Sequence, residues 1–240
     1  MSKHFYTVPV LWIFCLVALL GGCGRELQQQ QAFESFLQKE VIPRNSGILI
    51  PTTTMRKKFG IYASHYDVIV EYNKAVLEKV GKPLEKLQRE YQDAVKPEAN
   101  VEERRKAIIK YREALRSIEV ALDKELAWTD SEIAKLEQPD ELKKIYTLAV
   151  EKHIRIPAQV LKAMIPATEE MMNKNLDLLD FIAANKGKVE IKDGQIQVDG
   201  KKDKDQATLN RLREMQDEIV RMAKAIQAQH NEFTRQLISK

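Results

Sequence analysis

Apolar residues recur at steps of three and four along most of this sequence, which is the spacing of one face of an α-helix. The clearest stripe consists of Ile108, Tyr111, Leu115, Ile118 and Leu122. Comparable stripes run from Met55 to Val80 and from Leu212 to Leu237. Near seven-residue spacing is typical of long helices that lie almost parallel or antiparallel. The sequence therefore predicts a mainly all-α fold, an elongated bundle of long, coiled-coil-like helices, formed by one chain or with a second copy as a homo-oligomer.

Capping and breaking residues predict where these helices begin and end. Thr53 or Thr54 can cap the first long helix, and Gly81-Lys82-Pro83 predicts a kink or break in it, because proline disrupts a regular helical turn. Asn100 and Glu103 have the spacing of a capping box. The helix that they start could extend to Gln138 or break near Trp128.

The region after this helix has further interruptions. Pro157 and Pro166 punctuate it, and Thr168 is expected to cap a new helix. Asn185-Lys186-Gly187 predicts a helix end. Val189, Ile191, Ile196 and Val198 then alternate with polar residues around Asp193-Gly194. This alternation predicts one small β-hairpin near residues 188–199, packed on the helices or paired with residues 48–50.

The first residues have the pattern of a secretory signal. Lys3 gives a weakly basic start, and an apolar run of about 13 residues extends from Val8 to Leu20, short of the roughly 20 residues of a membrane-spanning helix. Leu20-Gly21-Gly22-Cys23 follows and resembles the lipobox of bacterial lipoproteins. The resemblance implies cleavage before Cys23, a diacylglycerol on its thiol, and an acyl chain such as palmitate on its amine. An ordinary signal peptide or an uncleaved membrane anchor is the alternative.

These features divide the chain into a cleaved signal peptide (1–22), a lipidated Cys23 with a polar tether (23–31) and a single helical domain (32–240). Several acyl chains hold a protein stably on a membrane, whereas one binds reversibly. The residue after Cys23 is glycine and not aspartate, which by resemblance to the Gram-negative sorting pattern favours the outer membrane. Phe33, Phe36, Leu37 and Val41 then predict a short amphipathic helix that docks on the body or, alternatively, lies against lipid.

Composition narrows the range of partners. Charged residues make up 31% of the chain and nearly cancel, with a formal net charge of +4. This balance differs from the concentrated positive charge of a nucleic-acid-binding surface, so we expect no nucleic-acid partner. Cys15 leaves with the signal and Cys23 carries lipid, so no thiol remains for a disulfide or a Cys-ligated metal.

No sequence pattern indicates catalysis, a metal or a cofactor. His65, His153 and His230 lack metal-ligand spacing, and His230 occupies an apolar stripe. The mature chain contains no phosphate loop, dinucleotide-binding fingerprint, nucleophile elbow or zinc-protease motif. Glu102-Glu103 and Glu169-Glu170 lie at expected helix starts, where acids stabilise the helix dipole. We therefore expect a non-enzymatic protein with no catalytic, cofactor-binding or metal-binding residue.

Two further sets of residues have both a structural and a functional interpretation. Methionines lie on the apolar stripes, at Met164, Met171, Met172, Met215 and Met222. They are expected in the core, with a Met-lined groove for an acyl chain or peptide as the alternative. The basic clusters Arg56-Lys57-Lys58 and Lys201-Lys202 with Lys204 are expected to be solvated. Contact with anionic headgroups or peptidoglycan is the alternative for them.

Several stretches match a known pattern in order and spacing over most of the mature chain. They are residues 31–38 (QAFESFLQ), Lys57-Lys58-Phe59-Gly60 leading to Tyr66 and Tyr72, Pro157-Ala158, Ile165-Pro166-Ala167 and Asp180-Phe181-Ile182-Ala183. Together they resemble the YiaF-type envelope lipoproteins of enterobacteria, a family of unknown function. The resemblance implies a Gram-negative envelope lipoprotein with a helical body, and it brings no catalytic residues.

The sequence thus predicts a lipid-anchored helical protein that faces the periplasm, with the outer membrane favoured over the inner membrane. It would act as a non-enzymatic interaction or scaffold protein for an envelope protein or the cell wall. A carrier or sensor of a lipid or small apolar ligand is the alternative, because Met-rich, kinked helices could open a groove.

Overall fold

The computed structural model describes residues 11–45, 47–94, 96, 99–192, 195–198 and 206–239. The chain is mainly helical, as predicted. Its α-helices are α1 (Leu11–Phe36), α2 (Thr53–Phe59), α3 (Ala63–Val76), α4 (Lys82–Ala94), α5 (Val101–Ile133), α6 (Asp140–Val150), α7 (Ile156–Ala184) and α8 (Gln206–Ser239). Short 3₁₀ or π turns join several of them end to end.

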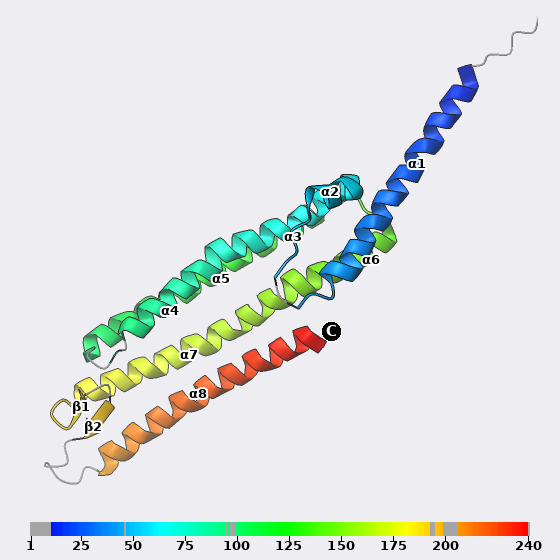
Figure 1. Cartoon of the computed structure of the whole chain (residues 1–240). Coiled ribbons are helices and arrows are strands. Elements are labelled where there is room, and N and C mark those ends of the chain that lie inside the picture. The colour runs from blue at the N-terminus through cyan, green and yellow to red at the C-terminus, as the bar shows by residue number, and fades with distance from the viewer. Residues whose placement is uncertain are drawn as a thin grey trace, which may run out of the picture.

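Four long helical segments lie side by side in an elongated array (Figure 1). The segment α2–α4 runs in one direction and α5 returns beside it, and then α6–α7 and α8 repeat this pattern. Contacts join α5 to α3 and α4, α7 to α5, and α8 to α7, so neighbours in sequence are neighbours in space. α1 projects from the end of the array where α2 and α6 lie. Coiled-coil geometry between these helices stays a prediction.

An aromatic cluster forms the core at the α1 end. Phe33 and Phe36 from α1 contact Phe59, Tyr62 and Tyr66, with ring centroids 4.9 to 6.5 Å apart. Close, tilted and edge-on ring pairs add to the free energy of burying these large apolar surfaces. The predicted docking of the 33–41 face on the body is confirmed, because its four apolar side chains are all buried.

A second core lies at the opposite end of the array. Ile108, Met172, Leu179 and Leu212 are buried there, so α5, α7 and α8 meet around one cluster. Strands β1 (Val189–Lys192) and β2 (Gln195–Val198) pair antiparallel, with Ile191 opposite Ile196. Val189, Ile191 and Ile196 belong to this second cluster. Residues 193 and 194 lie outside the described residues.

Three π-helical turns, in which a main-chain N–H bonds to the carbonyl five residues earlier, each end directly before an X-Pro bond. They are η1 (Leu37–Val41) before Pro43, η3 (Leu77–Gly81) before Pro83, and η4 (Glu151–Arg155) before Pro157. In a regular helix a proline ring clashes with the carbonyl four residues earlier. A wider turn gives the ring room, so the chain stays helical across Gly81-Lys82-Pro83 and does not break there.

The predicted start of α5 is confirmed, and its predicted end is not. Asn100 Oδ1 accepts from the Glu103 N–H at 3.0 Å, while the Glu103 carboxylate accepts from the Asn100 N–H at 2.9 Å. The helix continues unbroken past Trp128 and ends at Ile133, before Gln138. Next to Trp128, the Thr129 hydroxyl donates to the Glu125 carbonyl at 2.8 Å within the same helix.

The two predicted threonine caps are both wrong. Thr52, not Thr53 or Thr54, caps α2 and accepts from the Met55 N–H at 3.3 Å. Thr168 lies inside α7, which runs on through Pro166, and its hydroxyl donates to the Met164 carbonyl at 2.8 Å. A threonine hydroxyl inside a helix can donate a hydrogen bond to a carbonyl of the preceding turn. A threonine by itself therefore does not mark a helix start.

Residues 24–31, expected as a polar tether, are helical. They belong to α1, which continues without interruption to Phe36. Their side chains are mostly exposed, and Gln29 and Gln30 are half-buried. Within the described part of the chain, no helix combines the length and apolar character needed to cross a bilayer.

Candidate functional site

The described residues nearest to Cys23 contact the body through α1. Glu26 Oε1 lies 3.5 Å from the hydroxyl of Tyr62, which donates to it. Gln29 lies against Gly60, where a Cβ atom would stand 2.0 Å from the Gln29 Oε1. Gly60 also has φ +56°, a conformation that side chains other than glycine rarely adopt. The turn between α2 and η2 (Gly60–Tyr62) thus lets α1 approach closely, so the first turns after Cys23 do not hang free of the body.

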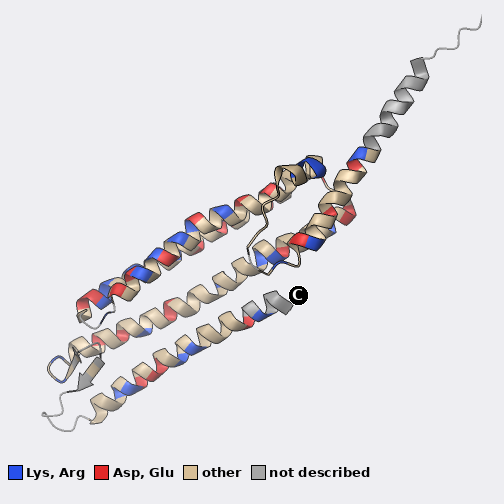
Figure 2. Ribbon diagram, viewed as in Figure 1, with Lys and Arg blue, Asp and Glu red and all other residues tan. Residues whose placement is uncertain are grey.

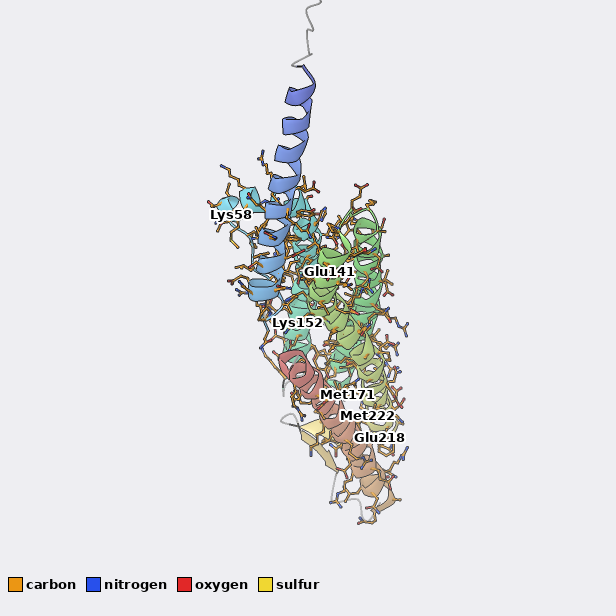
Figure 3. The ribbon with its side chains drawn as sticks, turned by 90° about the vertical axis from the view of Figure 1, so that its right-hand side faces the viewer. Lys58, Glu141, Lys152, Met171, Glu218 and Met222 are labelled. Carbon is orange, nitrogen blue, oxygen red and sulfur yellow. The ribbon has the colours of Figure 1, made fainter. Side chains whose placement is uncertain are left out.

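Basic and apolar side chains are exposed around this contact. Arg25, Lys57 and Lys58 are exposed, and so are Leu27 and Ile61, at 52% and 60%. Figure 2 shows the basic residues of α2 beside α1, and Figure 3 shows Lys58 pointing away from α1. Exposed cations next to apolar side chains are typical of surfaces that meet anionic headgroups. We call these five residues the basal surface.

Arg56, the first residue of the predicted basic cluster, is not available to this surface. Its guanidinium donates to both carboxylate oxygens of Asp67 at 2.5 and 2.7 Å. The hydrogen bond and charge of Asp67 raise the pKa of Arg56. Arg56 therefore ties α2 to α3, and only Lys57 and Lys58 of the cluster face outward. Lys201, Lys202 and Lys204 lie outside the described residues, as does the side chain of Cys23.

The structure separates the three histidines. His65 is buried in α3, and its Nδ1 lies 3.0 Å from Gln138 Nε2. His153 is half-buried in η4, and its Nε2 lies 2.8 Å from the Val41 carbonyl oxygen. His230 is exposed on α8, so of the buried and edge positions open to it only the edge of the stripe fits. Among the described residues, no group of three or more histidine, cysteine, aspartate or glutamate side chains could hold a metal.

The carboxylate pairs have structural contacts. Glu103 completes the α5 capping box, and Glu102 lies in the same first turn. Glu169 accepts from Arg116 at 2.8 Å and links α7 to α5. Glu170 is exposed on α7, far from a helix start, because α7 begins at Ile156. None of these contacts brings two carboxylates and a histidine together.

The methionines mostly take their expected place in the core. Met172 is buried in the second core, and Met171 and Met215 pack against it. A groove of about 560 Å³ instead lies between α4 and α5, lined by Leu87, Tyr91, Ala94 and Ala107 together with charged residues. The lining of this groove contains no methionine, so it is not the Met-lined groove that was the alternative.

Comparison with known proteins finds a family but adds no activity. Residues 10–234 match the family described as "Protein of unknown function (DUF3053)". The chain belongs to this family. It is 26% identical over 183 residues to the "Uncharacterized protein YiaF" of Escherichia coli (strain K12) and of Shigella flexneri, which covers 73% of this chain and 74% of each relative. No solved structure matches it. The resemblance predicted from the sequence is thus confirmed.

Sequence reasoning missed the residues that join α1 to the body beside the basal surface. Glu26 and Gln29 were expected in a tether, although they face Tyr62 and Gly60. The available signal was Phe33, which lies about two helical turns or less further along and had to be buried. Glutamine and glutamate are good helix formers. A helix that contains the buried Phe33 can therefore begin before the glutamines that precede it in the chain.

Proposed function

We propose that this protein is a lipid-anchored envelope protein that holds an elongated helical body against a membrane as a non-enzymatic interaction element. In this proposal Cys23 is the lipidated N-terminus after removal of residues 1–22. The body faces the periplasm of a Gram-negative bacterium, with the outer membrane as the favoured site. Its partner is an envelope protein or the cell wall.

The observation that carries the proposal is the docking of α1 on the body. Phe33 is 0% exposed, and the helix between Cys23 and Phe33 spans roughly 15 Å at 1.5 Å per residue. An acylated Cys23 would therefore hold the α2 end of the array close to the bilayer. Arg25, Lys57 and Lys58 would then lie within reach of anionic headgroups, each contributing on the order of 1 kcal/mol.

The anchor is tested by the mass of the mature N-terminus. Wild-type protein from cell envelopes is expected to begin at an acylated Cys23. Cys23→Ser is expected to carry no acyl group and to keep residues 1–22, while Cys15→Ser is expected to mature like the wild type. A wild-type chain without acyl groups, or with another N-terminal residue, contradicts the anchor.

The interaction role is tested by photocrosslinking in intact cells. A photoreactive amino acid replaces Val120 on α5, Leu148 on α6 or Val220 on α8, which are 69%, 58% and 50% exposed. Val41, which is 1% exposed, is the control position. At least one exposed position is expected to give a discrete adduct that Val41 does not give. The absence of any adduct from all three exposed positions counts against an interaction role.

The groove between α4 and α5 favours a second candidate function, a carrier or sensor of a small apolar ligand. Its volume of about 560 Å³ falls in the usual range of small-molecule sites, and Leu87 and Tyr91 give it apolar walls. A fluorescent fatty acid is expected to bind saturably, and Ala107→Trp is expected to abolish binding by filling the groove. The exposed Ala127→Trp is not in the groove and serves as the control. Equal binding by both variants contradicts this candidate.

A further inference from the structure

A second, smaller pocket lies where three distant parts of the chain meet. Its volume is about 240 Å³, and its lining residues are Arg44, Asn45, Gly47, Asn73, Lys152, His153 and Pro157. They come from the loop after η1, from α3, and from η4 with the first turn of α7. Figure 3 labels Lys152 between Glu141, near the α1 end, and Met171 further along. The pocket is therefore apart from both the basal surface and the groove between α4 and α5.

The lining carries positive charge without a compensating acid. Arg44 and Lys152 are its charged members, and no aspartate or glutamate lines it. Many other basic side chains of this chain lie in ion pairs across helices, such as Lys79 with Glu125 and Arg116 with Glu169. Glu151, next to Lys152 in the chain, is not a lining residue. Its Oε2 is buried without a hydrogen-bond partner among the described residues, so Glu151 does not neutralise the pocket through a direct bond.

Arg44 leaves hydrogen-bonding capacity unused. Its Nε is buried and has no partner in the described part of the chain. A buried donor without a partner is unusual, because losing its contact with water costs free energy. A guanidinium presents its N–H groups in a planar fork that matches the oxygens of a carboxylate or phosphate. As a lining residue, Arg44 therefore gives the pocket a positive charge and planar N–H donors, both of which suit an anionic ligand.

The amide and ammonium groups of the pocket add donors. Lys152 Nζ donates to Asn45 Oδ1 at 3.3 Å, which leaves the Asn45 NH₂ group and the other ammonium hydrogens available. Asn73 Nδ2 donates to the Ile69 carbonyl at 2.9 Å and has a second hydrogen. An oxyanion in the pocket would thus meet both positive charge and several donors.

The positive charges of the pocket also act on the pKa of His153. Its Nε2 must donate to the Val41 carbonyl, because a carbonyl only accepts, and the neutral ring then keeps Nδ1 as an acceptor. Burial lowers the pKa of His153, the positive charges of Lys152 and Arg44 lower it further, and the bond to Val41 opposes this. A π-helical turn such as η4 is often found at functional sites. Here it places Lys152 and His153 beside the loop that carries Arg44.

We propose that this pocket binds a small oxyanion group, of the phosphate or carboxylate class, between Arg44, Lys152 and the amides of Asn45 and Asn73. At about 240 Å³ the pocket is below the usual size of a drug-like ligand site and suits a headgroup or a small metabolite. Binding joins the loop after η1 to η4 and α3, so it raises the stability of the whole array. The site needs no lipid anchor and stands independently of the function proposed above.

Thermal unfolding of the full-length protein in detergent tests the site directly. Inorganic phosphate is titrated at constant ionic strength, with chloride as the balancing anion. A ligand that binds only the folded state raises the melting temperature with a saturable dependence on concentration. The wild type is expected to show this behaviour with phosphate and not with chloride. No saturable rise with phosphate or with acetate overturns the proposal.

Matched variants locate the binding. Arg44→Gln and Lys152→Gln each remove one positive charge and are expected to weaken phosphate binding about tenfold or more. Lys144→Gln removes the same charge from an exposed position on α6 and is expected to bind like the wild type. Circular dichroism checks the fold of each variant, and Arg44→Lys keeps the charge but lacks the planar guanidinium fork, so it is expected to bind more weakly than the wild type. Equal affinity in all four variants overturns the proposal.

The source of the oxyanion is resolved by competition. Glycerol 1-phosphate and vesicles of phosphatidylglycerol carry the same phosphate in soluble and lipid form. Displacement of phosphate by the vesicles supports a lipid headgroup, and displacement by glycerol 1-phosphate alone supports a soluble phosphate ester. Displacement by acetate with greater affinity than phosphate supports a carboxylate ligand.

Discussion

The hydroxyl of Tyr146 donates a 2.8 Å hydrogen bond to the main-chain carbonyl of His65, across 81 residues of sequence. Both residues are buried, at 1% and 8% exposure. The bond joins α6 to α3 beside the aromatic cluster that receives α1. It therefore helps to hold together the end of the array that carries the basal surface.

Removing this hydroxyl is expected to destabilise the protein. Tyr146→Phe leaves the buried carbonyl of His65 without this partner, and it should lower the free energy of unfolding by about 1–2 kcal/mol. Tyr66→Phe is the matched control, because the Tyr66 hydroxyl is buried without a partner among the described residues. The free energy of unfolding of the Tyr66→Phe control should equal or exceed that of the wild type. Urea unfolding measures both, and an equal loss in the two variants contradicts the assignment.

The ion pair between η3 and α5 should matter more than an exposed pair of the same kind. Lys79 Nζ lies 2.5 Å from the Glu125 carboxylate, whose side chain is only 7% exposed. Lys79→Met leaves that carboxylate without its partner and is expected to cost about 1–3 kcal/mol. Lys82 pairs with the exposed Glu78 in a nearby turn, so Lys82→Met should change stability by less than about 0.5 kcal/mol. A similar loss in both variants is the result that excludes this explanation.

Gly60 is expected to tolerate no side chain. Its φ of +56° strains any other residue, and a Cβ would collide with Gln29. Gly60→Ala should lower the free energy of unfolding by about 1–3 kcal/mol. Gly81→Ala is the control, since Gly81 has a helical conformation and a Cβ there meets Leu77 Cδ1 at 3.3 Å. Adding Gln29→Ala to Gly60→Ala should recover only the share of the lost unfolding free energy that is due to the collision. A double-mutant cycle measured in urea separates this share from the backbone strain.

Acid is expected to weaken the fold through its buried histidines. Burial lowers the pKa of both His65 and His153 from the ordinary value of 6.5. As the pH falls below about 6.5, the unfolded chain takes up protons that the folded chain does not, so the free energy of unfolding decreases until the folded pKa values are passed. His65→Gln and His153→Gln should each make this decrease between pH 7 and pH 5 shallower than in the wild type. The measurement is urea unfolding in buffers without phosphate, with pH 8 as the baseline for each variant. Unchanged slopes in both variants contradict the prediction.

Local sequence signals predicted many helix boundaries correctly where the interaction is local. Asn100 and Glu103 cap α5 as expected, because both partners lie within one turn. The 33–41 stripe docks as expected, because four apolar side chains on one face require burial. Thr168 and Trp128 were misjudged because a threonine hydroxyl can bond to the preceding turn and because an amphipathic stripe outweighs a weak stop signal. Pro83 and Pro157 predicted interruptions of the helices, but only the folded chain shows that a π turn precedes each of them.

The sequence by itself determined the helical class, the presence of long helices, the start of α5, the family, and the expectation that Cys23 is the anchor. These features follow from periodicity, capping and short motifs, which act over a few residues. The tertiary structure alone decided which helices are neighbours, how α1 meets Gly60, and where Arg44, Asn73 and His153 come together. His153 and Val41 are 112 residues apart, and the burial that lowers the His153 pKa exists only once those segments have packed. Charge balance and hydrogen-bond satisfaction depend on such long-range neighbours, so the oxyanion pocket could be found only in the folded chain.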